Sequence, residues 1–175
     1  MRFAPLALTL AVVLTGCMST ASPSGSSSPG SLSGFVDCDG LRSIIAAGQA
    51  SPDFASIRTD QQVEASGFFN NYAVTAEVAG ADRVYLQQQF DRDDSSRRFA
   101  VVVAEQSTTG NAGAARVLIP TDLSLCLGDS WTPEDVDNGK EYSDGGDVTL
   151  AYYVLSQNDG ATLVRFSVFG PEYRD

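Results

Sequence analysis

A serine-rich segment near the N-terminus limits how much of this chain can fold. Eight of the 17 residues from Met18 to Gly34 are serine, and glycine and proline supply much of the remainder. A segment of this composition has little apolar surface to bury and cannot offset the entropy lost on ordering. We therefore expect a tether here and a single domain over residues 35–175, which is long enough for one sizeable hydrophobic core.

The residues before the tether have the pattern of an export signal. Met1-Arg2 is a short positive start, and Phe3 to Leu14 is an apolar run of 12 residues. A membrane-spanning helix needs about 20 apolar residues, whereas the core of a signal peptide is shorter. Leu14-Thr15-Gly16-Cys17 follows directly, with an aliphatic residue, two small residues and a cysteine.

This tetrapeptide resembles the lipobox of bacterial lipoproteins. The resemblance implies cleavage between Gly16 and Cys17, transfer of a diacylglyceryl group to the Cys17 sulfur, and acylation of the new N-terminus. It makes residues 1–16 a signal peptide and residues 17–34 a lipidated tether. An ordinary secretory signal with a chance cysteine is the alternative.

The resemblance implies a location in the bacterial cell envelope. Two or more acyl chains hold a protein stably on a membrane, and the tether spans about 20–25 Å as a coil. We therefore expect a domain that is anchored by lipid and held off the membrane surface. Met18 is not Asp, so in a Gram-negative cell the sorting rule for lipoproteins favours the outer membrane, facing the periplasm.

Charge and the absence of histidine exclude several classes of function. The chain carries a formal net charge of −11, with 11 Lys and Arg against 22 Asp and Glu. Binding to a phosphate backbone needs clustered Lys and Arg, so we expect no nucleic-acid partner. The count of His is 0, which excludes Ser-His-Asp and Cys-His catalysis and His-ligated zinc.

Apolar residues at helical spacing predict two helices. The first has Asp39 as its cap, carries Leu41, Ile44 and Ile45 on one face, and ends at Gly48. The second spans Ala112–Leu127, with Ile119, Leu123, Cys126 and Leu127 on one face and Gly128 as its stop. Pro120 lies inside this segment, where a proline kinks a helix or starts one.

Alternating apolar residues predict about five strands. They fall at residues 72–78, 84–90, 99–105, 148–155 and 161–169, and Asn158-Asp159-Gly160 is a hairpin signal between the last two. Helices and strands are segregated, which indicates an α+β fold. We predict an antiparallel sheet with both helices packed on one face, in the order α-β-β-β-α-β-β.

This order of elements, from Asp39 to Phe169, is similar to the type III secretion chaperone-like fold. Members of that fold mostly bind other proteins, so the resemblance implies a binding function by analogy of fold. An α+β sandwich of the PsbP type, also found in lipoproteins, is the alternative architecture.

Two cysteines remain after Cys17, and they predict a disulfide. An even pair in an exported domain favours a bond between Cys38 and Cys126. Cys38 precedes the first helix and Cys126 ends the apolar face of the second, so the bond would join the two helices. Two buried free thiols are the alternative. A reactive thiolate is disfavoured, because Asp37 and Asp39 flank Cys38 and a thiolate needs a cationic neighbour.

Residues 129–147 are predicted to be a long acidic loop. Calcium prefers several oxygen ligands on one flexible loop, and this segment is rich in carboxylates. The EF-hand spacing fails, however, because the twelfth position counted from Asp135 is Gly146. We expect a solvated loop, and we predict no metal-binding, cofactor-binding or catalytic residue.

Aromatic residues are the remaining candidates for a binding surface. Tyr85 and Tyr153 fall on strand faces opposite Val84 and Val154, and Trp131 opens the acidic segment. With both helices on one face, the other face of the sheet would stay partly open, and exposed aromatics there could hold a partner. The alternative is a second core layer formed by residues 54–69 folding across that face.

The leading hypothesis is a membrane-anchored, non-catalytic binding or adaptor lipoprotein that engages another envelope protein. The alternatives are a lipoprotein that binds a small molecule or a cell-wall glycan, and an envelope enzyme that uses paired carboxylates. Either the open sheet face or the acidic segment 129–147 could be the binding surface.

Overall fold

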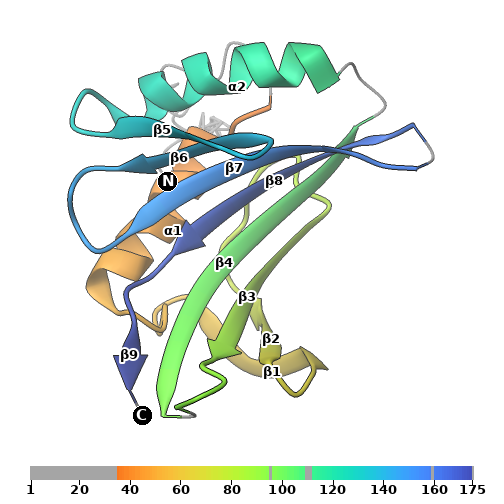
Figure 1. Cartoon of the computed structure of the whole chain (residues 1–175). Coiled ribbons are helices and arrows are strands. Elements are labelled where there is room, and N and C mark those ends of the chain that lie inside the picture. The colour runs from red at the N-terminus through yellow and green to blue at the C-terminus, as the bar shows by residue number, and fades with distance from the viewer. Residues whose placement is uncertain (1–34, 95, 109–111, 159, 175) are drawn as a thin grey trace, which may run out of the picture.

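The computed structural model describes residues 35–94, 96–108, 112–158 and 160–174. Within these residues two helices and nine strands form an α+β fold, and every strand pairing is antiparallel (Figure 1). The elements are α1 (Cys38–Ala50), β1 (Arg58–Ala65), β2 (Phe69–Val74), β3 (Arg83–Phe90), β4 (Arg97–Thr108), α2 (Ala112–Leu127), β5 (Thr132–Val136), β6 (Gly139–Ser143), β7 (Thr149–Ser156), β8 (Thr162–Phe169) and β9 (Tyr173–Arg174).

The predicted α+β class and antiparallel sheet are confirmed, whereas the predicted count of five strands is wrong. The sheet has the order β1-β2-β3-β4-β8-β7-β6-β5, and β9 pairs with β4 outside this path. The additional strands are β1, the hairpin β5–β6 and the short β9. The chain therefore runs α-β-β-β-β-α-β-β-β-β-β rather than α-β-β-β-α-β-β.

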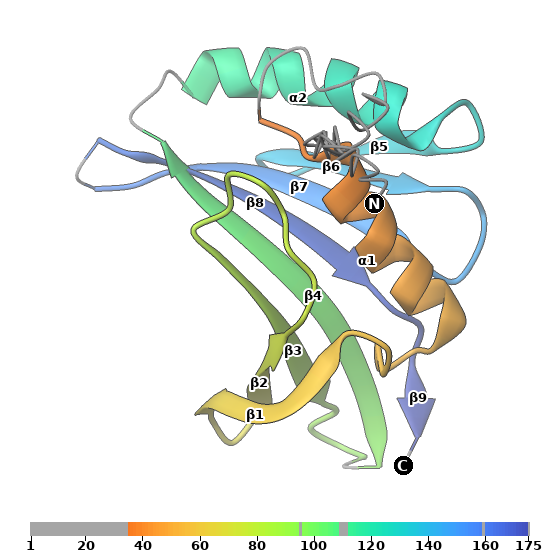
Figure 2. The ribbon, with the colours of Figure 1, turned by 180° about the vertical axis from the view of Figure 1, so that it is seen from behind.

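The sheet is curled, and both helices lie inside the curl or across its end (Figures 1 and 2). Helix α1 contacts β8, and α2 contacts α1 and β7. The face of the sheet that meets the helices, here called the inner face, supplies the core from alternate positions of each strand. Its buried side chains include Leu86, Val102, Ala104, Leu150, Tyr152, Val154, Val164, Phe166 and Val168.

Helix α1 begins two residues earlier than expected, because its cap is Asp37 and not Asp39. An Asp37 carboxylate oxygen accepts a 3.2 Å hydrogen bond from the backbone N–H of Gly40. The other oxygen accepts a 2.7 Å bond from the N–H of Ala79. Asp37 thus satisfies a free donor of the first turn and ties the loop between β2 and β3 to the helix.

Gly48 lies within α1 and does not end it. A Cβ atom at Gly48 would stand 2.7 Å from the ring of Phe54, which is fully buried. Glycine is needed here because the aromatic ring lies directly against the helix backbone. The helix continues to Ala50, and the next residue, Ser51, is extended.

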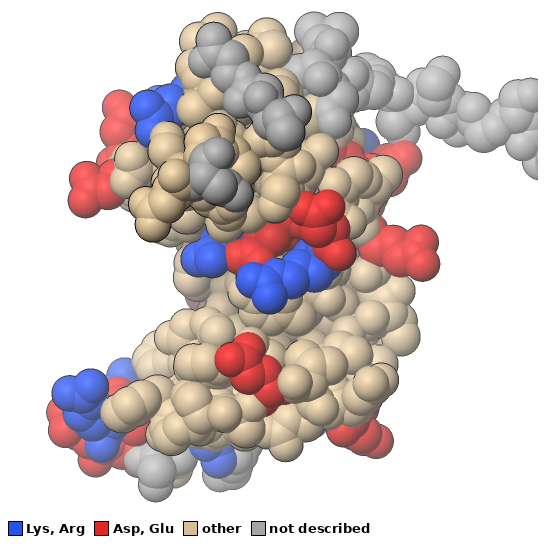
Figure 3. Space-filling view, turned by 90° about the vertical axis from the view of Figure 1, so that its right-hand side faces the viewer, with Lys and Arg blue, Asp and Glu red and all other residues tan. Residues whose placement is uncertain are grey.

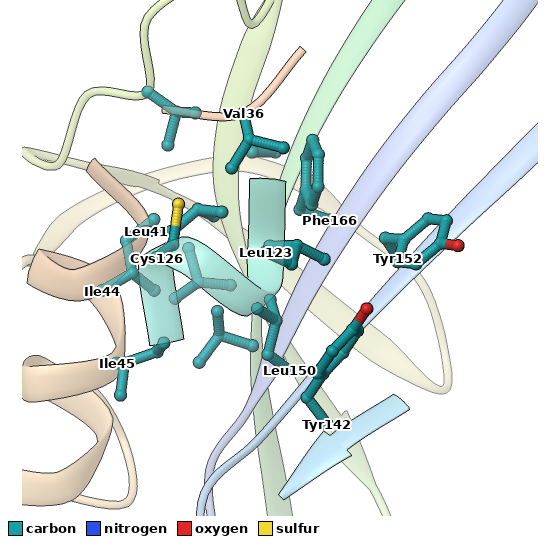
Figure 4. Packing of buried hydrophobic residues seen from close by; sticks show 14 of the residues in the cluster. Val36, Leu41, Ile44, Ile45, Leu123, Cys126, Tyr142, Leu150, Tyr152 and Phe166 are labelled. Atoms are coloured by element: carbon teal, nitrogen blue, oxygen red, sulfur yellow. The ribbon is translucent and has the colours of Figure 1, made fainter. Parts of the chain in front are cut away.

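Helix α2 has the predicted bounds and contains Pro120. Its predicted buried face is confirmed for Ile119, Leu123 and Cys126, and Gly128 follows with a positive φ of 80°. Figure 4 shows how the two helices meet: Leu41, Ile44 and Ile45 of α1 lie beside Cys126, with Leu123 next to the sheet residues Leu150 and Phe166.

Strand β2 begins and ends earlier than the predicted segment 72–78. It pairs with β3 from Phe69 to Ala73 and ends at Val74. Val78 lies beyond the strand, yet it is buried in the core. The alternation of apolar residues therefore indicates which side chains are buried in the core, and it continues beyond the last residue of the strand.

Candidate functional site

The second face of the sheet, here called the outer face, carries no helix within the described part of the chain (Figures 1 and 2). Val101, Val103 and Ala151 on this face are nevertheless buried. Larger side chains on neighbouring strand positions surround them. These include Tyr85 and Gln87 of β3, Glu105 of β4, Tyr153 of β7, and Arg165 and Phe169 of β8.

A buried carboxylate lies between two arginines on the outer face. Glu105 pairs with Arg83 of β3 and with Arg165 of β8 in the register of the sheet. The Arg83 Nε bonds one carboxylate oxygen, and the Arg165 Nε donates a 2.8 Å bond to the other. The Glu105 side chain is 3% exposed, whereas those of Arg83 and Arg165 are 66% and 37% exposed. One carboxylate thus fixes two guanidinium groups that still face solvent.

The Arg83 guanidinium also lies 5.3 Å from the ring centre of Tyr85. Its hydrogen bond to Glu105 raises the pKa of Arg83 above its ordinary value. Burial raises the pKa of Tyr85, and the charge on Glu105 adds to that rise. The phenol of Tyr85 therefore stays uncharged at neutral pH, beside the ion pairs that Glu105 makes with Arg83 and Arg165.

A row of hydrogen-bonded polar side chains continues across β1, β2 and β3. Asn71 donates from Nδ2 to a Glu64 carboxylate oxygen at 2.9 Å. Gln87 donates from Nε2 to the Asn71 Oδ1 at 3.2 Å, and Gln89 donates to the Gln87 Oε1 at 2.9 Å. These mutual bonds hold the amides in fixed orientations, which reduces the entropy that they would lose on binding a ligand.

Two shallow cavities lie along this face. One of about 530 Å³ is lined by Glu64, Asn71, Arg83 and Tyr85, among others. The other, of about 350 Å³, lies between β3–β4 and β6–β8 and is bordered by Phe99 and other residues. Figure 3 views the molecule from the side of β3 and β4, where the surface is hollowed across its middle and charged side chains of both signs gather. We call the two cavities and the charged centre the outer-face groove.

Two of the three aromatic residues predicted for a binding surface lie on this face. Tyr85 and Tyr153 are half-buried on the outer face. Trp131 is not there, because it packs against the core and borders a cavity with Arg42 and Cys126. The predicted alternative of a second core layer is wrong: the segment 54–69 contains β1, which is the edge strand of the same sheet beside β2.

Residues 129–147 are not a long loop but contain the hairpin β5–β6. Residues Asp137 and Asn138 form its turn, and Asn138 has a positive φ of 64°. Asp135 is paired with Lys140 across the hairpin. Among the described residues, no group of three or more Asp, Glu, Cys or His side chains comes together in a way that could hold a metal ion.

The predicted disulfide is present. Cys38 in the first turn of α1 is bonded to Cys126 in the last turn of α2, and their Cα atoms are 5.1 Å apart. The predicted lipidation site, Cys17, lies outside the described residues.

The sequence analysis did not identify Arg83, Glu105 or Arg165. The sequence does contain one signal for Glu105, which directly follows the apolar run from Phe99 to Ala104. A carboxylate at the end of such a run lies in a central strand, and a buried carboxylate needs a cationic partner. Which arginines supply that partner depends on the strand order, because Arg165 is 60 residues away in the chain.

Comparison of the chain with known families, with curated proteins and with solved structures finds no match. The lipobox and the chaperone-like order of elements therefore stay predictions. Neither helix in the described part of the chain has the length and hydropathy that a membrane span requires.

Proposed function

We propose that this chain is a lipid-anchored, non-catalytic binding protein of the bacterial cell envelope that holds another envelope protein in its outer-face groove. The observation that carries the proposal is the pair of solvent-facing arginines fixed on the buried Glu105 at the centre of a sheet face without a helix. The chain has a net charge of −11, so two guanidinium groups that share one carboxylate and still face solvent are a specific feature of its surface.

The chemistry of the groove favours a partner segment that carries a carboxylate beside apolar side chains. Arginine binds carboxylates through paired N–H groups. Arg83 bonds Glu105 through Nε, and Arg165 contacts it through both Nε and Nη2, so Arg83 keeps more of its N–H groups free for a ligand. Phe99 and Phe169 border the smaller cavity and supply apolar contacts. An acidic peptide segment satisfies both features at once.

A cell-wall glycan is the second candidate ligand. The oriented amides of Asn71, Gln87 and Gln89 favour it, since sugars need several fixed donors and acceptors, and Tyr85 lies in the same cavity. An uncharged glycan would leave the two arginines without a role in binding, so their substitution separates the two candidates.

The anchor proposed at Cys17 would restrict where the partner is met. The 17 residues from Met18 to Gly34 would allow a reach of about 20–25 Å from the bilayer as a coil, and about 60 Å at full stretch. We infer that the partner lies in the same membrane or close to its surface. In a Gram-negative cell the proposed location is the outer membrane, facing the periplasm.

Site-specific photo-crosslinking in cells tests the groove. A photoreactive phenylalanine analogue replaces Tyr85 or Tyr153, and in the control it replaces Gln49, which is exposed on α1. We expect one protein to be captured from the two groove positions and not from Gln49, through a segment containing Asp, Glu or a C-terminal carboxylate. Capture from all three positions alike, or from none, would contradict the proposal.

Substitution of the arginines then separates the candidate ligands. Arg83→Gln together with Arg165→Gln is expected to abolish capture of the protein, whereas Arg92→Gln, exposed in the loop after β3, leaves it unchanged. Unchanged capture in the double variant would show that the charged centre does not bind the partner. Retained binding of cell-wall fragments by the double variant would favour the glycan.

The anchor is tested separately with Cys17→Ser. We expect this variant to leave the membrane fraction, because the sulfur that accepts the lipid is gone. Unchanged membrane association that still depends on detergent for release, with unchanged mass, would contradict lipidation at Cys17.

A further inference from the structure

Helix α2 exposes large aliphatic side chains on the side that faces away from the core. Val117 is 70% exposed, Leu118 is 40% exposed and Leu125 is 48% exposed. Among the described residues, the other large hydrophobic side chains that are exposed are Val63, Phe68 and Phe99, and none of these is on a helix. The aliphatic surface is therefore concentrated on one element.

The three side chains lie on one face of the helix. At 100° per residue, positions 117, 118 and 125 fall within an arc of about 100°. Ala115, Ile119, Leu123 and Cys126 face the core from the other side. We call Val117, Leu118 and Leu125 the aliphatic stripe.

The aliphatic stripe carries no charge, although the chain is strongly acidic. The charged residues of α2 are Arg116 and Asp122. Asp122 is buried, and Arg116 reaches towards the sheet, where it donates a 3.3 Å bond to the carbonyl oxygen of Val154. No carboxylate of this helix therefore repels an anionic surface from the stripe.

The stripe also lies at the end of the domain where the N-terminal segment joins it. Leu125 is next to Cys126, and the disulfide joins Cys126 to Cys38 in the first turn of α1. The chain between Cys17 and Phe35 is 17 residues long. A lipid on Cys17 would therefore allow this end of the domain to reach the bilayer, in place of the expected arrangement in which the tether holds the whole domain off the surface.

We propose that the aliphatic stripe of α2 rests on the bilayer in which the lipid of Cys17 is inserted. The inference rests on the proposed lipid anchor. Helix α2 lies in the plane of the membrane interface, with Val117, Leu118 and Leu125 among the acyl chains nearest the headgroups. Attachment through a linker of this length would give an effective concentration in the millimolar range, so a weak apolar contact is enough to orient the domain.

This orientation leaves the outer-face groove accessible. Helix α2 runs along one end of the molecule in Figure 1, and the hollow in Figure 3 opens to the side and below that end. The groove would open parallel to the membrane surface, where it can receive a segment of a protein that lies in or on the same membrane.

A second copy of the chain fits the stripe less well than a bilayer does. A helix of 16 residues is about 24 Å long and about 10 Å wide, so its outward face offers about 240 Å². A stable protein interface buries about 800 Å² per partner. A bilayer contact needs no such area, since the lipid anchor supplies the attachment.

Trp131, the one tryptophan of the chain, provides a probe, because it borders a cavity with Cys126 and Leu127 at the end of α2. The mature chain, beginning at Cys17, is coupled through that thiol to a maleimide lipid. It is then bound to vesicles of phosphatidylethanolamine and phosphatidylglycerol with brominated acyl chains. The other two cysteines are in the disulfide and do not react. This coupling makes the test independent of lipidation in the cell.

We expect the brominated lipid to quench Trp131 fluorescence at least twofold. The variant V117Q/L118Q/L125Q should lose this quenching, and the control Val63→Gln, exposed on β1, should keep it. Circular dichroism melts establish that each variant folds. Equal quenching in the wild type and the triple variant, or none in either, would overturn the inference.

Two further outcomes separate the bilayer contact from the proposed lipid anchor and from dimer formation. If the protein made in cells does not float with membranes but the coupled protein is quenched through the stripe, the anchor proposal fails and the contact stands. If the Cys17→Ser protein sediments as a dimer that the triple variant abolishes, a second copy occupies the stripe and the bilayer contact is overturned.

Discussion

Arg42 donates a 2.8 Å hydrogen bond from its Nε to the backbone carbonyl oxygen of Cys126. That carbonyl belongs to the last turn of α2, where carbonyl groups have no partner within the helix. A cation at this end also interacts favourably with the helix dipole. The hydrogen bond and the neighbouring disulfide thus attach the end of α2 to the first turns of α1.

Loss of the disulfide is expected to destabilise the domain strongly. The bond closes a loop with a sequence separation of 88, for which chain entropy gives an upper value of about 4–5 kcal/mol. At about 2–4 °C per kcal/mol, we expect C38S/C126S to lower the melting temperature by about 10 °C or more. Thermal denaturation followed by circular dichroism measures this.

The reducing agent serves as a control for this variant. It should lower the melting temperature of the wild type and leave that of C38S/C126S unchanged. Thiol labelling of the unfolded, non-reduced protein should find neither cysteine. Ready labelling of both would show that the bond does not form.

Gly139→Ala is expected to disrupt the pairing of β6 with β7. A Cβ at this position would stand 1.7 Å from the carbonyl oxygen of Tyr152, so the strands must separate or shift in register. We expect a loss of more than about 2 kcal/mol in the free energy of unfolding, as for other overpacked sites. Denaturant titration measures it.

Gly67→Ala is the matched control, because a Cβ at Gly67 meets no atom within 4 Å. We expect its free energy of unfolding to stay within about 0.5 kcal/mol of the wild type. Similar losses in the two variants would show that the close approach at Gly139 does not limit stability.

The stability of the domain is expected to fall steeply at alkaline pH because of Tyr142. Burial raises the pKa of Tyr142 to about 12, and its proximity to Tyr152 and Asp135 contributes. An unfolded tyrosine has a pKa of about 10. The neutral phenol therefore contributes full stability below about pH 10, and about 2–3 kcal/mol is lost as the pH rises to about 12.

Tyr142→Phe keeps the ring and removes the ionisable hydroxyl. Between about pH 10 and 12 we expect this variant to lose less stability than the wild type, as measured by urea denaturation across that range. Tyr153→Phe, on the outer face, should retain the wild-type dependence. If Tyr142→Phe and the wild type lose stability in parallel, the phenol of Tyr142 is not the cause.

Glu105→Gln is expected to destabilise the fold and to disorder the groove. The change removes a buried anion that bonds both Arg83 and Arg165. Loss of one partner of a fully buried pair costs about 3–5 kcal/mol. Because both arginines are partly in solvent, which screens them, we expect about 1–3 kcal/mol.

Glu134→Gln is the control for charge alone, since Glu134 is exposed on β5. Chemical denaturation should show a loss for Glu105→Gln that is at least twice that for Glu134→Gln. Equal effects would indicate that the ion pairs at Glu105 add nothing beyond net charge.

The elements that the sequence predicted well are those whose buried faces are apolar. Helix α2 and the strands β3, β4, β7 and β8 all place aliphatic side chains on the inner face at regular spacing. Strand β1 has no such pattern, because it is an edge strand and most of its side chains are exposed. The hairpin β5–β6 was predicted to be an acidic loop because the side chains of β5 are mostly exposed as well. Asn138-Gly139 is nevertheless a turn signal typical of hairpins.

The candidate site was less accessible to prediction than the fold. Tyr85 and Tyr153 could be assigned to the outer face because alternation alone determines the face of a side chain. The contact of Glu105 with Arg165 could not be predicted from alternation. Strands β4 and β8 become neighbours only because the chain between them, which carries α2 and β5–β7, crosses over and returns to the edge of β4. A contact between two strands that are far apart in the sequence can be predicted only when the strand order of the sheet is known.

The position of β4 at the centre of the sheet has a consequence for how the chain folds. One edge of β4 pairs with β3, which precedes it directly, whereas the other pairs with β8, where Val101 meets Phe169. Until the C-terminal strands are available, the apolar run of β4 keeps an open edge, and open edges promote aggregation. A chain that is delivered N-terminus first can therefore complete its sheet only when nearly all of it has arrived, and a chain cut before Thr162 is expected to aggregate rather than to keep a half-sized sheet.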